Sequence, residues 1–431
     1  MRILVCGINY APDLIGVPKY NTELCESLAG FGHEVRVVTA PPYYPAWHTP
    51  AAHRVRLYRR ERRNGVSLVR APIYVPARPS GARRLLHHAS FAASSALPLA
   101  SAALSWRPDI VFAVAPSLLS APIAALAARM CGATAWLHLQ DLEIDAAFGL
   151  GLLKDGGLRR AMLVVERGIL GVFDRVSTIS PQMIARLEQK GVPRHRLYEL
   201  RNWVDVAAIR PGARDTRLRA ELGLGPSDVV ALYSGAMSHK QGLDLVVAAA
   251  AALQATDPHI RFVLCGNGPH REDLQRLGEG LENLRFLDLQ PAERLSELLA
   301  TADIHLMPQR PEAADLVLPS KLSGMLASGR PVVVMAEPGT GIACEAEGAG
   351  LVTRPGNVDD LVAAVRTLAA DSGLRAELGA GARQRAERAW DRGAIMAGLD
   401  EAFASLGRAA RAGGPQVSSA LGEVRGGPPG G

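Results

Sequence analysis

Short apolar runs alternate with segments of helical spacing through the first half of the chain. Ile3–Ile8 suits a buried strand, and Tyr20–Ala29 repeats Leu24 and Leu28 at helical spacing. The same pattern predicts further strands at 33–39, 67–71, 110–114, 134–139 and 175–179, and helices at 82–97, 116–130, 157–171 and 181–190. Because strands alternate with helices, we expect a parallel sheet with crossover helices.

The alternation restarts after residues 201–205 and the Pro211/Gly212 stretch. It predicts strands at 229–233, 261–265, 284–287, 303–307 and 331–335, and helices at 243–253, 269–277, 293–300, 319–328, 357–370 and 373–388. The fold class is therefore α/β, with two tandem Rossmann-like, doubly wound domains facing a cleft. The predicted divisions are 1–205, 206–390, a C-terminal helix at 391–412 and a disordered Gly/Pro/Ser-rich tail at 413–431. Ligands of such sheets bind beyond the carboxyl ends of the strands.

Composition narrows the class of protein. The 431 residues are 48% hydrophobic and 21% charged, which excludes wholesale disorder and coiled coil. Five cysteines without a CxxC pair argue against a disulfide framework or a zinc ribbon. No charged n-region or cleavage site follows Met1, so no signal peptide is expected. The low-charge stretch 89–106 is too short and too polar for a membrane span.

Positive charge is concentrated in the first half. Residues 1–205 carry 25 basic and 15 acidic side chains, against 23 and 27 in residues 206–431, and ten arginines lie within 54–84. This asymmetry predicts that the first half meets an anionic surface. Arg83 and Arg84 precede an apolar stretch, which suits an interfacial helix on anionic lipid, although an ordinary amphipathic helix fits equally well. Aromatic residues between the arginines are sparse, so no nucleic-acid partner is predicted.

Loops after the predicted strands hold the candidate donor-binding residues. The first loop lacks GxGxxG, so a standard NAD site is not expected. Gly16 lies just before a helix, where a glycine lets backbone amides approach a phosphate; a simple turn is the alternative. Lys240, in the matching loop of the second half, is a candidate diphosphate partner or a solvated surface lysine. The other candidate donor-binding residues of this region are glycines: Gly235 in the same loop, and Gly266 and Gly268 after the next strand.

Two further segments carry candidate chemistry. Pro319 suits the first turn of a helix, so the amides of 318–321, with Leu318, Ser320 and Lys321, could bind an anion; plain capping is the alternative. His138 and Asp141 follow a predicted strand and are expected to point into the cleft as catalytic candidates, or to be a core histidine beside a capping aspartate. No Asp-x-Asp, HExxH or His/Cys cluster occurs in the sequence, so no protein-held metal and no cofactor are predicted.

In this order, the loops resemble those of the retaining GT-B glycosyltransferases over about residues 1–405. The resemblance rests on Gly16, residues 32–39 (GHEVRVVT), 177–180 (STIS), Asn202 with Asp205, Lys240, and 326–333 (LASGRPVV). Residues 7–12 (GINYAP), 39–45 (TAPPYYP) and 318–322 (LPSKL) look more narrowly like the WcaI-type colanic-acid exopolysaccharide transferases.

The resemblance implies a metal-independent enzyme that moves a sugar, with fucose as a candidate, from a nucleoside-diphosphate sugar to a polyprenyl-linked intermediate. It implies retention at the anomeric carbon and a cytoplasmic enzyme attached peripherally to the inner face of the plasma membrane. Lys240 and the amides near Gly16 and Pro319 would stabilise charge on the leaving diphosphate.

The sequence departs from the broad family at two places. In its usual Glu-x7-Glu pair, the second Glu position falls on Gly324 and the first near Leu316 or Asp315. The family's Arg before the Lys is missing, and Met237 or Ser238 stands there. The Pro-Ser-Lys helix start is inferred to take over the ribose and sugar contacts of the Glu pair, and without the Arg, Lys240 would face the diphosphate with less help. Two alternatives stay open: a nucleotide-sugar epimerase of the same fold, and a non-catalytic partner subunit.

Overall fold

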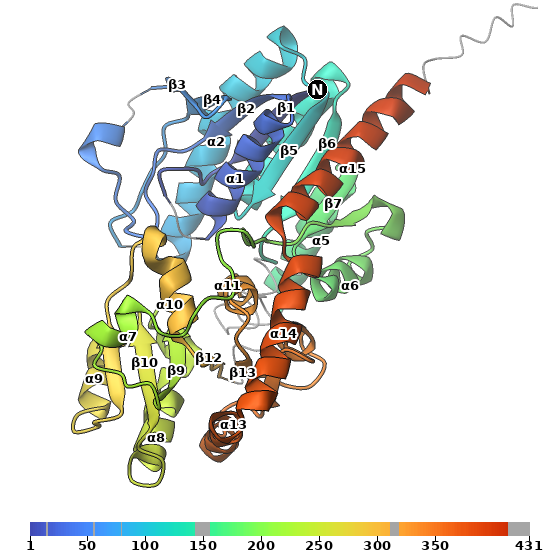
Figure 1. The fold of residues 1–431 in the computed structure, drawn as a ribbon. Coiled ribbons are helices and arrows are strands. Elements are labelled where there is room, and N and C mark those ends of the chain that lie inside the picture. The colour runs from blue at the N-terminus through green and yellow to red at the C-terminus, as the bar shows by residue number, and fades with distance from the viewer. Residues whose placement is uncertain (14–15, 55–56, 79, 143–155, 311–318, 413–431) are drawn as a thin grey trace, which may run out of the picture.

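The computed structural model describes residues 1–13, 16–54, 57–78, 80–142, 156–310 and 319–412; within these, nothing is stated about the side chains of residues 158, 240 and 407–412. Figure 1 shows two α/β units, one above the other, each built on its own sheet. The predicted fold class, two doubly wound parallel-sheet domains, is confirmed.

The first sheet has the strand order β3-β4-β2-β1-β5-β6-β7-β8 and is parallel except for the β3–β4 pair. Its strands are β1 (Arg2–Gly7), β2 (Glu34–Thr39), β3 (Arg59–Arg63), β4 (Val66–Arg70), β5 (Ile110–Ala115), β6 (Thr134–Leu139), β7 (Arg175–Thr178) and β8 (Leu197–Glu199). The helices of this unit are α1 (Val17–Gly30), α2 (Gly81–Ser105), α3 (Ala121–Cys131), α5 (Gly157–Gly171) and α6 (Pro181–Gln189). Nearly all residues of β1 and β5 are buried, as expected of central parallel strands.

The second sheet has the order β11-β10-β9-β12-β13-β14 and is parallel throughout. Its strands are β9 (Val229–Ser234), β10 (Ile260–Cys265), β11 (Leu284–Leu287), β12 (Ile304–Met307), β13 (Val332–Met335) and β14 (Gly350–Thr353). The helices are α7 (Arg217–Glu221), α8 (Leu243–Gln254), α9 (Arg271–Leu277), α10 (Leu295–Thr301), α11 (Lys321–Ala327), α12 (Gly341–Ala346), α13 (Val358–Ala370) and α14 (Ser372–Ala389).

The arginine-rich run near residue 60 is a strand that the apolar pattern did not predict. Arg59–Arg63 forms β3, antiparallel to β4 at the edge of the first sheet, and four of its five residues are exposed. No apolar residue marks this strand, so only its pairing with β4 defines it. Charged side chains on an edge strand also oppose edge-to-edge association.

Helix α2 continues past its predicted end at residue 97. Pro98 lies inside the helix and cannot donate a hydrogen bond to the Ser94 carbonyl. The Tyr58 hydroxyl donates to that carbonyl instead, at 2.8 Å, so the polar group keeps a partner. Although α2 has 25 residues, no helix in the described part of the chain is both long and apolar enough to cross a membrane.

The chain passes between the two units twice, and the two passages are joined. Val204 donates to the Trp390 carbonyl at 2.8 Å, and Arg392 ion-pairs with Asp205 at 2.6 Å. Helix α15 (Arg392–Ala412) then returns along the first unit (Figure 1). Its Phe403 ring lies 5.1 Å from the ring of Trp136, so the last helix completes the core of the first unit.

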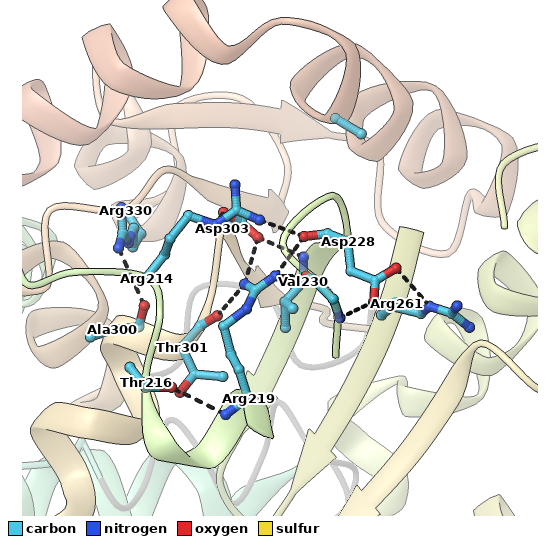
Figure 2. A network of polar contacts seen from close by, with 12 residues as sticks. Arg214, Thr216, Arg219, Asp228, Val230, Arg261, Ala300, Thr301, Asp303 and Arg330 are labelled. Carbon is cyan, nitrogen blue, oxygen red and sulfur yellow. Dashed lines mark hydrogen bonds and ion pairs between the residues drawn. The ribbon is translucent and has the colours of Figure 1, made fainter. Parts of the chain in front are cut away.

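A buried polar network holds the end of the second sheet where β9 and β12 begin (Figure 2). Arg219 donates to the Asp303 carboxylate at 3.0 Å, and the same carboxylate accepts from the Val230 amide at 2.8 Å. Both charged residues are at most 5% exposed. Removing one partner would leave a buried, unpaired charge, at a cost of about 3–5 kcal/mol. The network therefore secures the end of the sheet opposite the loops described next.

Candidate functional site

Two loops at the carboxyl edge of the second sheet lie against each other through their backbones. A Cβ on Gly266 would be 1.9 Å from the Gly235 carbonyl oxygen, and one on Gly268 would be 2.2 Å from the Met237 carbonyl oxygen. The Gly235 amide donates to the Cys265 carbonyl at 2.9 Å. Gly266 and Gly268, predicted as donor-binding residues, therefore have a packing reason to be glycine: they allow the loop that carries Gly235 to pack closely.

The Lys321 side chain points at Gly235. A Cβ on Gly235 would lie 3.6 Å from the Lys321 Nζ, and this Nζ lies 3.9 Å from the centroid of the Tyr233 ring. The nitrogen is buried, although the residue as a whole is partly exposed, and it has no hydrogen-bond partner among the described residues. Burial lowers the pKa of this lysine from 10.5 to about 7. Tyr233 supplies a π-face, and its hydroxyl donates to the Ala236 carbonyl at 2.6 Å.

The first unit reaches this site through α1. The Tyr20 side chain is buried, and its hydroxyl interacts with the Ser320 side chain immediately before α11. Burial raises the pKa of the Tyr20 phenol, so it stays protonated at neutral pH. Gly16 precedes α1 with φ +73°, and no atom lies within 4 Å of a Cβ built there. Ser320 and Lys321 thus lie where the two units meet, beside the α1 that begins after Gly16.

Lys240 belongs to a short 3-10 helix, η4 (His239–Gln241), that follows β9. Its backbone is at the expected carboxyl edge, but its side chain lies outside the described part of the structure. Arg310 holds this segment, since its Nε donates to the His239 carbonyl at 3.0 Å and its Nη2 to Asp244 at 2.8 Å. Leu318, another predicted donor-binding residue, lies outside the described residues.

His138 does not point into an open cleft, which corrects the expected orientation. It is 2% exposed; its Nδ1 is 3.0 Å from Ser177 Oγ, and its Nε2 is 3.0 Å from Gln140 Nε2. Burial lowers its pKa to about 3, so the imidazole is neutral. The side chain is a buried histidine with polar neighbours at both ring nitrogens. Asp141, which follows β6, is partly exposed.

Helix α2 presents a line of exposed apolar side chains. Leu86, Ala93, Leu97 and Leu104 recur at spacings of 7, 4 and 7 residues, which places them on one helix face. The three leucines are 55%, 64% and 63% exposed. Arg83 and Arg84 are exposed in the first turn of α2, and Arg84 lies 5.3 Å from the Trp47 ring. The structure therefore places the two predicted membrane residues at one end of an apolar stripe.

The carboxyl edge of the first sheet is hollowed beside this helix. A cavity of about 500 Å³ opens next to Trp47 and is lined by Pro41, Trp47, His48, Thr49, Arg54, Ile73, Val75 and Ala77. An aromatic side chain beside polar and cationic groups can stack on a sugar ring and hydrogen-bond its hydroxyls.

Comparisons with known proteins identify the family. Residues 16–203 match the glycosyl transferase 4-like domain, and residues 215–385 match glycosyl transferases group 1. The Escherichia coli (strain K12) protein WcaI, named as a colanic acid biosynthesis glycosyl transferase, is 41% identical over 376 residues, 85% of this chain and 91% of its own length. The chain belongs to the GT-B glycosyltransferases.

Solved structures agree with this fold. Sucrose-phosphate synthase from Thermosynechococcus elongatus has a TM-score of 0.73 and 18% identity, covering 95% of this chain and 99% of that one. Anabaena HepE, solved with UDP-glucose, has a TM-score of 0.67 and 17% identity over 94% and 100% of the two chains.

Three residues that contact the candidate site were not singled out from the sequence. Tyr20, Tyr233 and Arg310 carry no linear motif and are recognised only by what they touch. Gly324, where the family's usual second Glu would fall, has an apolar setting: a Cβ built there would lie 3.4 Å from Leu299 Cδ1 and 3.8 Å from Ile209 Cδ1. Lys321, at the predicted helix start, is the cation that the fold brings to Gly235.

Proposed function

We propose that this glycosyltransferase takes a sugar from a nucleoside-diphosphate sugar and adds it to a polyprenyl-linked exopolysaccharide intermediate with retention of anomeric configuration. The buried Lys321 nitrogen carries the proposal, because an amine directed at a glycine loop, with no hydrogen-bond partner among the described residues, is suited to a diphosphate. The name of the WcaI relative and the UDP-glucose complex of HepE support the substrate classes. Fucose is the candidate sugar that the family resemblance implies.

In the transfer step, the bond between the anomeric carbon and the β-phosphate oxygen breaks. The electron pair stays on the nucleoside diphosphate, an acceptor oxygen bonds to the anomeric carbon, and the acceptor proton leaves to the phosphate or to solvent. Negative charge therefore grows on the β-phosphate while the sugar becomes oxocarbenium-like. Lys321, Lys240 and the amides near Gly16 would stabilise that charge, and no protein nucleophile is required.

The acceptor side is assigned to the first unit and to a membrane surface. The cavity beside Trp47 would receive the sugar end of the acceptor. The leucine stripe of α2, with Arg83 and Arg84 at one end, would rest on the anionic inner face of the plasma membrane, where a polyprenyl chain remains. The enzyme would then be cytoplasmic and peripherally attached.

A thermal-shift screen of nucleotide sugars, followed by calorimetry on each hit, tests the donor assignment. We expect at least one nucleoside-diphosphate sugar to bind wild-type protein and an Arg366→Met control, which removes a surface charge paired with Asp257. The same sugar should bind Lys321→Met at least tenfold more weakly. Equal binding by all three proteins would refute the role of Lys321. Conversion of the donor to an isomeric sugar without acceptor would instead favour an epimerase.

A further inference from the structure

Three potential metal ligands from two loops lie near one another beside Lys240, the candidate diphosphate partner. His239 belongs to η4, His270 directly precedes α9, and Asp273 lies in the first turn of α9. Each offers one ligand atom, and these atoms lie within 4.8 Å of one another. The two imidazole rings have their centroids 3.8 Å apart. A linear motif search misses this group because the two histidines are 31 positions apart in the sequence.

The two ring nitrogens of His270 differ in their surroundings. It is 6% exposed, its Nδ1 lies 3.2 Å from Asp273 Oδ2, and its Nε2 is buried without a partner in the described structure. Buried polar atoms are nearly always paired in folded proteins, so an exception calls for an explanation.

We propose that His239, His270 and Asp273 bind one divalent transition-metal ion, with Zn²⁺ as the best match. Two imidazoles and one carboxylate suit Zn²⁺, Co²⁺ or Ni²⁺, whereas Mg²⁺ prefers an all-oxygen set. Ligand bonds of about 2.0–2.1 Å in a tetrahedral site place donor atoms about 3.3 Å apart. The 4.8 Å spread must therefore close, and the exposed His239 side chain, which lies against the His270 ring, would make that movement.

The ion would join η4 to the start of α9. These segments are already connected through Met237, whose carbonyl accepts from the His270 amide at 3.1 Å. A metal link would add a side-chain connection and restrain the segment that carries Lys240. Its role is structural: the leaving diphosphate is stabilised by cations and amides of the protein, so the transfer step itself does not pass through this ion.

Binding of Zn²⁺ and Co²⁺ to the full-length, donor-free protein tests this site. We expect calorimetry to show one Zn²⁺ per chain, and Co²⁺ to show the visible absorption of a four-coordinate site with nitrogen ligands. His239→Ala and Asp273→Asn, both at positions with exposed surface, should each weaken binding at least tenfold. His259→Ala removes an exposed histidine of the same unit and should bind as wild type does.

Equal Zn²⁺ affinity in wild type, His239→Ala and Asp273→Asn would overturn the site. So would a lack of binding by wild-type protein that is folded by circular dichroism. Nucleotide-sugar binding measured in EDTA remains a separate test of the donor assignment, so the two proposals can fail independently.

Discussion

Replacing Lys321 by Met should stabilise the donor-free protein and weaken donor binding. Burial lowers the pKa of this lysine from 10.5 to about 7. Between those values the unfolded chain holds more protons than the folded one, so the free energy of unfolding rises with pH through this window. Burial of the charged amine lowers the free energy of unfolding, and this effect reaches its full size below about pH 7. At 1.36 kcal/mol per pKa unit, the loss is about 5 kcal/mol below pH 7 and about 3 kcal/mol at pH 8.

Removing the amine removes that penalty. We expect Lys321→Met to raise the free energy of unfolding at pH 8 by about 3 kcal/mol, which corresponds to a rise in melting temperature of about 5 °C or more. The gain should shrink as pH approaches 10, where the wild-type lysine is neutral in both states. Arg366→Met should leave the melting temperature nearly unchanged, because a surface ion pair contributes about 0–1 kcal/mol.

Donor binding supplies the complementary measurement. A diphosphate beside the Lys321 nitrogen raises its pKa, so at pH 8 the complex should take up close to one proton. Calorimetry in buffers of different ionisation enthalpy measures this uptake, and a nucleotide sugar is the suitable probe because its diphosphate has no proton to release near neutral pH. Uptake should disappear in Lys321→Met. Proton uptake that is unchanged in the variant, or a melting temperature that falls, would refute the reasoning.

The remaining predictions concern charge, metal and membrane. Lys240→Ala should lower transfer about a hundredfold, as loss of one charge-stabilising donor does, and wild-type turnover would remove its assigned role. Transfer should survive EDTA, and complete loss that a single divalent ion restores would contradict the metal-independent mechanism. The protein should co-sediment with anionic vesicles at low salt and be released at about 1 M salt. The double variant Arg83→Glu, Arg84→Glu should sediment less with anionic vesicles and still bind the donor. The control Arg366→Glu, Arg388→Glu should sediment as wild type does. Equal sedimentation with neutral and anionic vesicles would exclude the electrostatic attachment.

The order of apolar runs was sufficient to predict the two parallel sheets. Strands such as Thr134–Leu139 and Leu284–Leu287 have the predicted bounds, because a buried parallel strand needs a short apolar run whatever its neighbours are. Gly16, the Pro319 helix start and the loop after β9 were likewise predicted as candidate phosphate-binding segments, since ligands of parallel sheets bind beyond the carboxyl ends of the strands.

Tertiary structure decided what the side chains at that edge can do. His138 and Lys321 both lie next to predicted element ends, yet packing gives the histidine two polar neighbours and leaves the lysine nitrogen without a hydrogen-bond partner in the described part of the chain. The β3 strand, with no apolar residue, exists only through its pairing with β4. The His239–His270–Asp273 group depends on the close packing of two glycine loops. Each outcome depends on residues distant in the chain, because burial and pairing are properties of the packed structure, whereas hydrophobic periodicity is a property of the sequence alone.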